Sequence, residues 1–226
     1  MKKKIGMIIA VEFAPFEQAY GKASQKINKQ GYEVSLYEKE NYVLYVLQSG
    51  AGEIQAAMST QFLIDEFGVE MILNYGVVGA LTEKLSHALV CIIKEVVDYR
   101  FDISEVDNVP VGRHIEFPER NFETDSFLRK KALEVEPNLL EVVDASGDRF
   151  VNKAEEKQAI AKDFGADICE MEASGILLTC IRNKIPALFI KVVADTLFGG
   201  ADEYSKKTDE AVRTCVHILD HIMENL

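Results

Sequence analysis

The chain has 226 residues, of which 48% are hydrophobic and 27% charged, and it contains 14 glycines and 5 prolines. This composition excludes a collagen-like protein, a disordered tail and a small disulfide-rich domain. Its 25 lysines and arginines are outnumbered by 37 acidic residues, which gives a formal net charge of −12. Because the basic residues form no cluster beyond Lys2–Lys4, we expect neither a nucleic-acid polymer nor an anionic membrane as a partner.

The apolar runs and the cysteines bear on the compartment and on metal binding. The first apolar run, Ile5–Val11, stops at Glu12, and no run approaches the roughly 20 residues of a membrane-spanning helix. The cysteines form no C-x-x-C pair and have no histidine at metal-ligand spacing. We therefore expect a cytoplasmic protein without a metal or cofactor, with four small core cysteines: Cys91, Cys169, Cys180 and Cys215.

Strand-like and helix-like segments alternate along the first half. Apolar runs rich in β-branched residues predict strands buried on both faces, whereas apolar residues three and four apart predict helices. In chain order we expect a strand at Ile5–Val11, a helix from Pro15 to near Gly31, a strand at Tyr42–Gln48, a helix from Ile54 to Phe67, and strands at Met71–Tyr75 and Leu89–Val97.

The alternation resumes after a polar segment, Asp98–Asp125, that predicts a long functional loop. No composition shift divides the chain, so we expect a single domain over residues 1–226. Its predicted architecture is a three-layer α/β/α sandwich around a twisted, mixed but mostly parallel sheet. The second half predicts helices at Ser126–Val135, from an Asn152 cap to Gly165, at Ala173–Asn183 and at Asp209–Asn225, and strands at Leu139–Ala145, Asp167–Met171 and Ala187–Ala194.

Acidic residues follow several of the predicted strands. Glu12 ends the first strand, Glu170 and Glu172 come between a short strand and a helix of small residues, and Asp195 ends the last strand. Ligands of such sheets bind beyond the carboxyl ends of the strands, so we expect these carboxylates to meet in one site. Each acid taken alone also fits a plain structural role at a helix start or in a turn.

Several carboxylates in one site suit the cleavage of an N-glycosidic bond. The ribosyl transition state resembles an oxocarbenium ion, which carboxylates stabilise, and the leaving base needs an acid to protonate it. Hydrolysis also needs a base that deprotonates water, and a further carboxylate can bind neighbouring ribose hydroxyls.

Two glycine-rich turns leave an anion site open as an alternative. Ser49-Gly50-Ala51-Gly52 precedes a predicted helix, whose N-terminus could bind phosphate, and Gly76-Val77-Val78-Gly79 could let the backbone approach a ligand. Neither turn has the spacing of a dinucleotide motif or the Gly-Lys-Ser/Thr ending of a phosphate loop. A tight turn is the simpler interpretation of both.

The strand ends carry a family resemblance over nearly the whole chain. Its most specific segments are Ser146-Gly147-Asp148-Arg149-Phe150-Val151 and Glu170-Met171-Glu172-Ala173. Ala10-Val11-Glu12, the Ser49–Gly52 turn, Asn74–Ala80 and Val193-Ala194-Asp195 match as well. On these segments the chain resembles the purine nucleoside phosphorylase superfamily, and within it the 5′-methylthioadenosine/S-adenosylhomocysteine nucleosidases.

The resemblance implies a purine nucleoside as substrate and gives roles to single residues. Asp195 would protonate the purine at N7, and Glu172 with Met171 would bind the ribose hydroxyls. The backbone at Phe150 and Val151 would read the adenine edge, and the Phe150 ring would stack on the base. The further residues expected in this pocket are Gly79, Glu170 and Lys191. The resemblance also implies a homodimer in which the neighbour's loop, here Asp98–Asp125, helps to cover the ligand.

The chain departs from the family pattern on the nucleophile side. Ala14 stands where the family has its water-activating glutamate, which leaves Glu12 as the candidate for that task. Val77 and Ala194 replace serines, and Lys191 replaces an arginine.

Three functions remain open. Hydrolysis of an adenine nucleoside is favoured over phosphorolysis, because phosphorylases of the superfamily place an arginine where Asn74 stands. Lys191, Arg149 or Arg100 could still bind phosphate in its place. A nucleoside-binding protein with little catalysis is the third interpretation, suggested by Ala14 and Val77.

Overall fold

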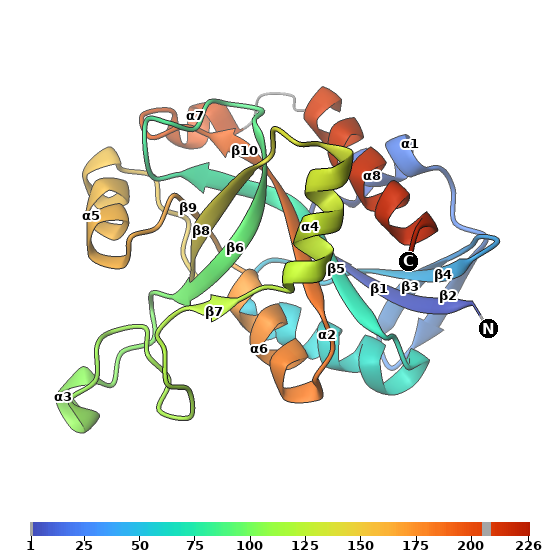
Figure 1. Cartoon of the computed structure of the whole chain (residues 1–226), viewed down its shortest axis with the longest axis horizontal. Coiled ribbons are helices and arrows are strands. Elements are labelled where there is room, and N and C mark those ends of the chain that lie inside the picture. The colour runs from blue at the N-terminus through green and yellow to red at the C-terminus, as the bar shows by residue number, and fades with distance from the viewer. Residues whose placement is uncertain (1, 205–208) are drawn as a thin grey trace.

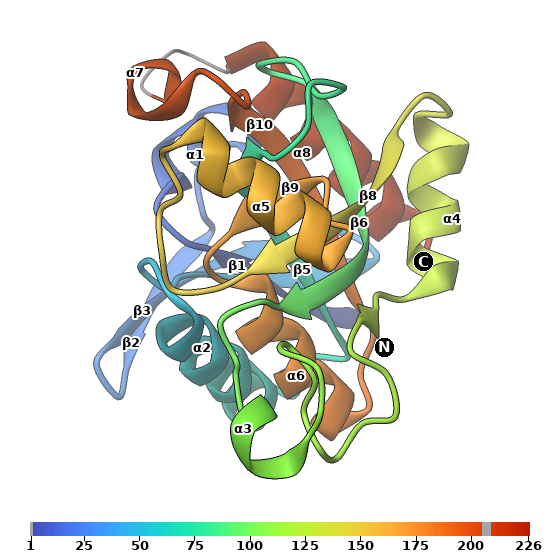
Figure 2. The same cartoon turned by 90° about the vertical axis from the view of Figure 1, so that its left-hand side faces the viewer.

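The computed structural model describes residues 2–204 and 209–226. Within them, ten strands form one mixed sheet. Helices lie on both faces of this sheet (Figures 1 and 2). The strands are β1 (Lys3–Ile9), β2 (Gln25–Lys29), β3 (Tyr32–Glu38), β4 (Tyr42–Gln48), β5 (Met71–Ala80), β6 (Val90–Asp98), β7 (Phe122–Glu123), β8 (Leu140–Ser146), β9 (Ile168–Glu170) and β10 (Ala187–Asp195).

Part of the sheet forms a closed ring of strands, and the rest is open. Its strand order is β10-β6-β8-β9-β5-β1-β4-β3-β2, and β10 pairs with β5 as well as with β6. Five strands therefore form a ring, from which β1, β4, β3 and β2 continue as an open wing. β1, β4, β5 and β10 are parallel, while β9 runs antiparallel to β5 and meets it at Gly79 and Ala80.

The helices form a layer on each face of the sheet. α2 and α6 pack together on one face, and α1, α4 and α8 cover the other (Figure 1). This arrangement confirms the predicted fold class. The helices are α1 (Phe13–Tyr20), α2 (Glu53–Phe67), α3 (Ser104–Asp107), α4 (Ser126–Val135), α5 (Ala154–Phe164), α6 (Ala173–Asn183), α7 (Gly200–Tyr204) and α8 (Asp209–Glu224).

The core lies on both faces of the sheet, because successive side chains of a strand point to opposite sides. On β1, Met7 and Ile9 pack in the cluster that contains Leu219 of α8. Ile8, between them, packs in the cluster of α2 and α6. All three side chains are fully buried, as expected of a continuous apolar strand.

The four cysteines are buried and form no disulfide, which confirms their expected place in the core. None of the helices within the described residues has both the length and the apolarity to cross a membrane. These residues also contain no group of three or more His, Cys, Asp or Glu side chains that could hold a metal ion.

The helix predicted from Pro15 to Gly31 is wrong beyond Tyr20. α1 ends there because Gly21 takes a φ of 105°, and the chain then forms β2, an edge strand that pairs with β3. Gln30 and Gly31 both have positive φ, as a tight hairpin turn requires. Only Ile27 of β2 is partly buried, so the strand shows no alternation of apolar and polar residues. The apolar residues of this segment happen to have helical spacing, which led to the wrong prediction.

Three other expectations need correction. The segment Asp98–Asp125 is not structureless, since it contains α3 and β7. Asn152 does not cap α5: Lys153 takes the N-cap position, and the Asn152 side chain accepts the Ala201 N–H at 2.9 Å instead. The predicted turn Gly76–Gly79 lies inside β5, where pairing with β10 keeps the backbone extended.

Candidate active site

A cavity of about 630 Å³, measured with its open mouth, lies where β1, β9 and β10 end beside β5. The residues predicted for the site come from five separate parts of the chain, and the fold brings them together here. All nine residues predicted for the site line the cavity: Glu12, Gly79, Phe150, Val151, Glu170, Met171, Glu172, Lys191 and Asp195.

Asp195 is the last residue of β10, and only 1% of its surface is exposed. Its carboxyl group lies over Gly79, where a Cβ atom would stand 3.2 Å from Oδ1, so the absence of a side chain allows this approach. The buried ammonium group of Lys157, from α5, forms an ion pair with Oδ2. Burial raises the pKa of Asp195 above its usual value, although Lys157 opposes the rise. The raised pKa favours the protonated form that a general acid needs.

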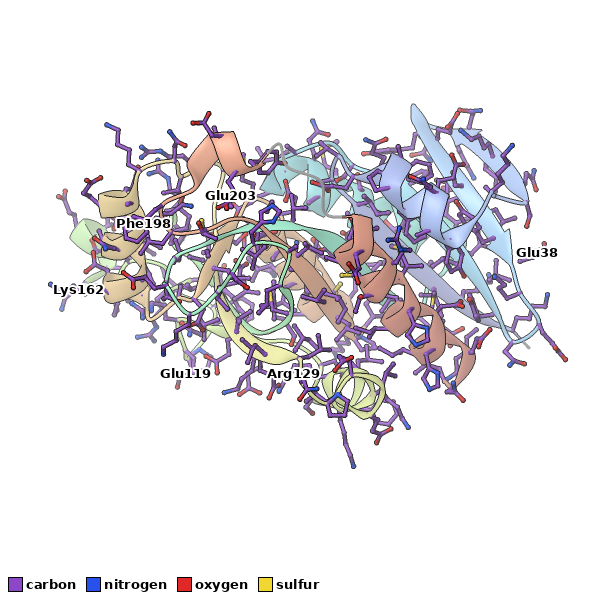
Figure 3. The ribbon with its side chains drawn as sticks, turned by 90° about the horizontal axis from the view of Figure 1, so that it is seen from above. Glu38, Glu119, Arg129, Lys162, Phe198 and Glu203 are labelled. Atoms are coloured by element: carbon purple, nitrogen blue, oxygen red, sulfur yellow. The ribbon has the colours of Figure 1, made fainter. Side chains whose placement is uncertain are left out.

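Two aromatic side chains flank this end of the cavity. Phe150 is 45% exposed, and its ring meets that of Tyr204 edge-on with 5.6 Å between the centroids. Tyr204 belongs to α7, which is fixed beside Asp195 because the Glu203 carboxylate accepts the Thr196 N–H at 2.7 Å. Figure 3 labels Glu203 on this helix. An exposed ring at a cavity can stack on a flat base.

Glu170 and Glu172 flank the start of α6. The Glu170 carboxylate accepts the backbone N–H of Glu172 at 3.1 Å and that of Ala173 at 2.9 Å, and so satisfies the helix N-terminus. The Glu172 carboxyl faces the cavity and accepts the Gly52 N–H at 2.9 Å. Burial, and then the charge of Glu170, raise the pKa of Glu172 to about 7. Its free acceptor positions can receive hydroxyl groups of a ligand.

Lys191 lies behind these two acids and is fully enclosed. Its Nζ is 3.1 Å from Oε2 of Glu170. Burial alone would lower the pKa of Lys191, but the charges of Glu170, Glu172 and Asp144 outweigh it and raise the pKa. Asp144, on β8, is completely buried, and its pKa is raised by burial and then by Glu170. Burial and the charge of Glu170 thus favour the protonated form of Asp144, next to the Glu170–Lys191 ion pair.

Glu12 immediately precedes α1, and its carboxyl group approaches Lys191 across Gly76. A Cβ atom on Gly76 would lie 3.4 Å from Lys191 Nζ and 3.8 Å from Glu12 Oε2. Burial raises the pKa of Glu12, while Lys191 opposes the rise. Ala14 is exposed and does not line the cavity. The buried Asn74 side chain donates to the Ile8 carbonyl at 2.8 Å.

Sequence reasoning missed three residues of this region. Lys157 could have been found from its spacing, since it lies on the α5 stripe that also holds Ile160, Ala161 and Phe164. Asp144 is an acid that directly follows two valines inside a strand, which is an equally readable anomaly. Tyr204 has no comparable signal, because its place depends on how α7 folds back over the cavity mouth.

The arrangement of acids agrees with a comparison of the chain with protein families, in which the model of the phosphorylase superfamily matches residues 4–224. The chain belongs to the phosphorylase superfamily. This membership confirms the predicted resemblance over nearly the whole chain.

Several proteins similar to this superfamily member are nucleosidases. The chain is 30% identical over 185 residues to the 5′-methylthioadenosine/S-adenosylhomocysteine nucleosidase of Staphylococcus epidermidis, covering 79% of this chain and 80% of that protein. It is 28% identical over 230 residues to the aminodeoxyfutalosine nucleosidase of Helicobacter pylori, covering 99% and 98%. The solved futalosine hydrolase of Helicobacter pylori has a TM-score of 0.91 at 25% identity, with 99% of this chain and 98% of that chain covered. At the level of the family, these relatives confirm the prediction of a nucleosidase.

Proposed function

We propose that the protein hydrolyses the N-glycosidic bond of an adenine nucleoside of the 5′-methylthioadenosine/S-adenosylhomocysteine type, releasing the free base and a ribose derivative. The observation that carries the proposal is the meeting of a buried acid, Asp195, with the carboxyl groups of Glu172 and Glu12 in one cavity. The similarity to the staphylococcal nucleosidase supports this substrate class.

Asp195 acts on the base. Its proton passes to N7 of the purine as the bond between C1′ and N9 breaks, so the electron pair leaves on a neutral base rather than on an anion. The exposed ring of Phe150 stacks on the purine, and the backbone at Phe150 and Val151 contacts the edge of the adenine base. The small Gly79 leaves room for the base beside the Asp195 carboxyl.

Glu172 binds the ribose together with Met171. Two neighbouring hydroxyl groups can donate to one carboxylate, and this fixes the sugar relative to the acid. The same negative charge stabilises the oxocarbenium character that develops at C1′.

Glu12 and Lys191 serve the nucleophile. The water oxygen bonds to C1′ while one of its protons passes to the Glu12 carboxylate. Lys191 lies next to this carboxylate across Gly76 and favours its charged form. Glu12 thereby takes the task for which Ala14 has no functional group.

Phosphorolysis is the alternative, and two observations count against it. The side chain in the expected arginine position, Asn74, already donates to a backbone carbonyl. The one cation that the described residues bring to the buried nucleophile end, Lys191, is surrounded by the carboxyl groups of Glu170, Glu172 and Asp144, which disfavour a phosphate dianion. A nucleoside-binding protein with little catalysis remains the third candidate, since Val77 and Ala14 make this end less polar.

Aminodeoxyfutalosine is a second candidate substrate, because the relative of that specificity is similar over 99% of this chain. We further propose a homodimer in which the segment 98–125 helps to cover the neighbour's ligand. The match over residues 4–224 supports a single domain. We also propose a cytoplasmic location and a part in methionine salvage.

The test is an incubation of the purified protein with 5′-methylthioadenosine, S-adenosylhomocysteine, aminodeoxyfutalosine, adenosine and inosine, each with and without phosphate. Chromatography then quantifies the free base. Release of adenine without phosphate supports hydrolysis, and comparison of kcat/KM identifies the preferred 5′ substituent. Strict dependence on phosphate would establish the phosphorylase alternative, and binding without base release would establish a binding protein.

A further inference from the structure

Lys157 is a buried cation beside the candidate acid. It lies on α5, far in sequence from Asp195, and its side chain exposes none of its surface. We propose that Lys157 is a positioning residue for Asp195: its ammonium group holds one carboxyl oxygen and stabilises the carboxylate that remains after the proton has passed to the base. This inference rests on the proposed function, in which Asp195 is the general acid.

The two oxygens of the Asp195 carboxyl group differ in their contacts, because Lys157 binds only one of them. Lys157 Nζ forms the ion pair with Oδ2 and donates a second hydrogen bond to the Thr196 carbonyl at 2.8 Å. Both carboxyl oxygens lie over Gly79 at the cavity wall, 3.2 Å (Oδ1) and 3.3 Å (Oδ2) from the place of a Cβ atom, but within the described residues no side chain donates to Oδ1. With Oδ2 held, Oδ1 is the oxygen that can carry a proton to a ligand.

Packing alone gives no reason for a lysine at this position. Ile160, one turn further along α5, belongs to an apolar cluster with Val151 and Cys169. A buried ion pair contributes little net stability, since the removal of two charges from water offsets their attraction. An apolar side chain would fill this face of α5 as well as the lysine does, so a role in the acid's chemistry accounts better for the charge.

The chemical effect follows from the direction of proton transfer. The reactive form of Asp195 is the protonated one: it gives its Oδ1 proton to N7 and becomes the carboxylate that the ion pair with Lys157 holds, in a buried place where an unpaired charge is poorly solvated. The Lys157 ammonium keeps all its protons and supplies a nearby positive charge when the carboxylate forms. Asp195 thus becomes a stronger acid than burial alone would leave it.

Other charged or titratable groups face Asp195 as well. Glu203, from α7, raises the pKa of Asp195, and His87, from the segment between β5 and β6, lowers it. Both effects are smaller than that of Lys157. The Cys169 thiol of β9 and the Tyr204 hydroxyl of α7 have raised pKa values, and both are therefore neutral near pH 7. Lys157 is accordingly the group whose removal changes the acid most.

The test is the pH dependence of kcat/KM for adenine release by the full-length protein. Activity needs protonated Asp195, so the rate falls as the pH rises through the pKa of this acid in the free enzyme. Lys157→Met removes the charge at similar size. We expect the alkaline limb to move upward by about one pH unit or more and the plateau to fall at least about tenfold, because a weaker acid donates its proton less readily.

Two variants provide matched controls. Lys157→Arg keeps the charge and should keep the alkaline limb close to its original pH. Lys162→Met removes a lysine from the exposed side of the same helix, where Figure 3 shows it at the outer edge of the molecule, and should leave the whole profile unchanged. If Lys157 served packing alone, its replacement could lower the amount of folded protein but would not shift either limb of the pH profile of kcat/KM.

An alkaline limb of Lys157→Met that coincides with the original would overturn the inference. If that variant does not fold, Lys157→Gln, which keeps a hydrogen-bond donor without the charge, gives the same readout. The proposed function fails separately: Asp195→Asn with unchanged turnover would remove Asp195 as the acid. An inactive Asp195→Asn together with an unmoved limb in the Lys157 variants would overturn only the role of Lys157.

Discussion

Lys191 Nζ and Glu170 Oε2 lie 3.1 Å apart, and these side chains expose only 1% and 2% of their surface. Burial would raise the pKa of Glu170, but Lys191 and the Ala173 N–H outweigh it, so Glu170 stays ionised. The pair links β10 to the first turn of α6, whose N-cap residue is Glu172. The backbone of Glu172, whose carboxyl group is proposed to bind ribose, is thus positioned by the ion-paired Glu170 carboxylate behind the cavity wall.

Asp195→Asn should abolish most of the turnover of adenine nucleosides while leaving binding intact. The amide keeps the shape of the side chain but cannot deliver a proton to N7, so we expect kcat to fall by about 10²- to 10⁴-fold. Steady-state kinetics and calorimetric titration with 5′-methylthioadenosine measure the two effects. Asp163→Asn, on the exposed side of α5, is the control and should behave as the original protein. Full activity of Asp195→Asn would show that another group protonates the base.

Glu12→Gln should greatly reduce the hydrolytic rate, because the amide cannot accept a proton from the attacking water. We expect a loss of about 10²-fold or more in kcat with little change in nucleoside affinity. Ala14→Glu is an informative companion: residue 14 is exposed and does not line the cavity, so the added carboxyl should not raise the original rate. Unchanged hydrolysis by Glu12→Gln would exclude Glu12 as the base.

The pKa of about 7 at Glu172 predicts a pH-dependent affinity. As the pH rises from 5.5 to 8.5, Glu172 ionises and becomes a better acceptor for ribose hydroxyls, so KM should fall. Glu172→Gln should raise KM and remove most of this dependence, whereas Glu40→Gln, at an exposed turn, should retain it. A pH-independent KM in the original protein would contradict this assignment.

Glu53 offers a test of stability outside the cavity. Its carboxyl group accepts hydrogen bonds from Ser146 and Ser174, yet burial raises its pKa to about 7. The unfolded chain ionises Glu53 near its ordinary value, so between about pH 4.5 and 7 the folded state binds more protons and stability falls as the pH rises.

Glu53→Gln removes this titration. The variant should therefore become more stable relative to the original protein as the pH rises from 5.5 to 8.5. With allowance for solvent screening, we expect a relative gain of about 1 kcal/mol in the free energy of unfolding, measured as a higher relative melting temperature. Glu83→Gln, at an exposed position, serves as the control. A difference between variant and original that stays constant with pH would contradict the raised pKa of Glu53.

The fold class and the residues that line the cavity could be predicted from the sequence, whereas the strand connections around the cavity could not. Asp195 could be located because it ends a strongly apolar strand, and Glu172 because it follows a short one; strand ends are where ligands bind in α/β sheets. The strand pairing that places Glu172 at the cavity was not predictable. β9 runs antiparallel to β5, and the ring of five strands closes through a β5–β10 pairing that no local sequence pattern encodes.

The errors have local physical causes. The exposed edge strand β2 carries no alternation of apolar side chains, so it could not be distinguished from the tail of a helix. Asn152 has the side chain of a helix cap, but a tertiary partner, the Ala201 N–H, uses it instead. Lys157 was overlooked because a lysine on a helix is expected to be solvated.

The central claim is that water, and not phosphate, receives the ribosyl group. The direct measurement is the reaction of 5′-methylthioadenosine in phosphate-free buffer made with H₂¹⁸O, followed by mass spectrometry of both products. The account predicts stoichiometric adenine and a single ¹⁸O at C1 of the methylthioribose, before slow exchange of that oxygen with solvent. Release of adenine only after phosphate is added, with formation of a ribose 1-phosphate, would contradict it.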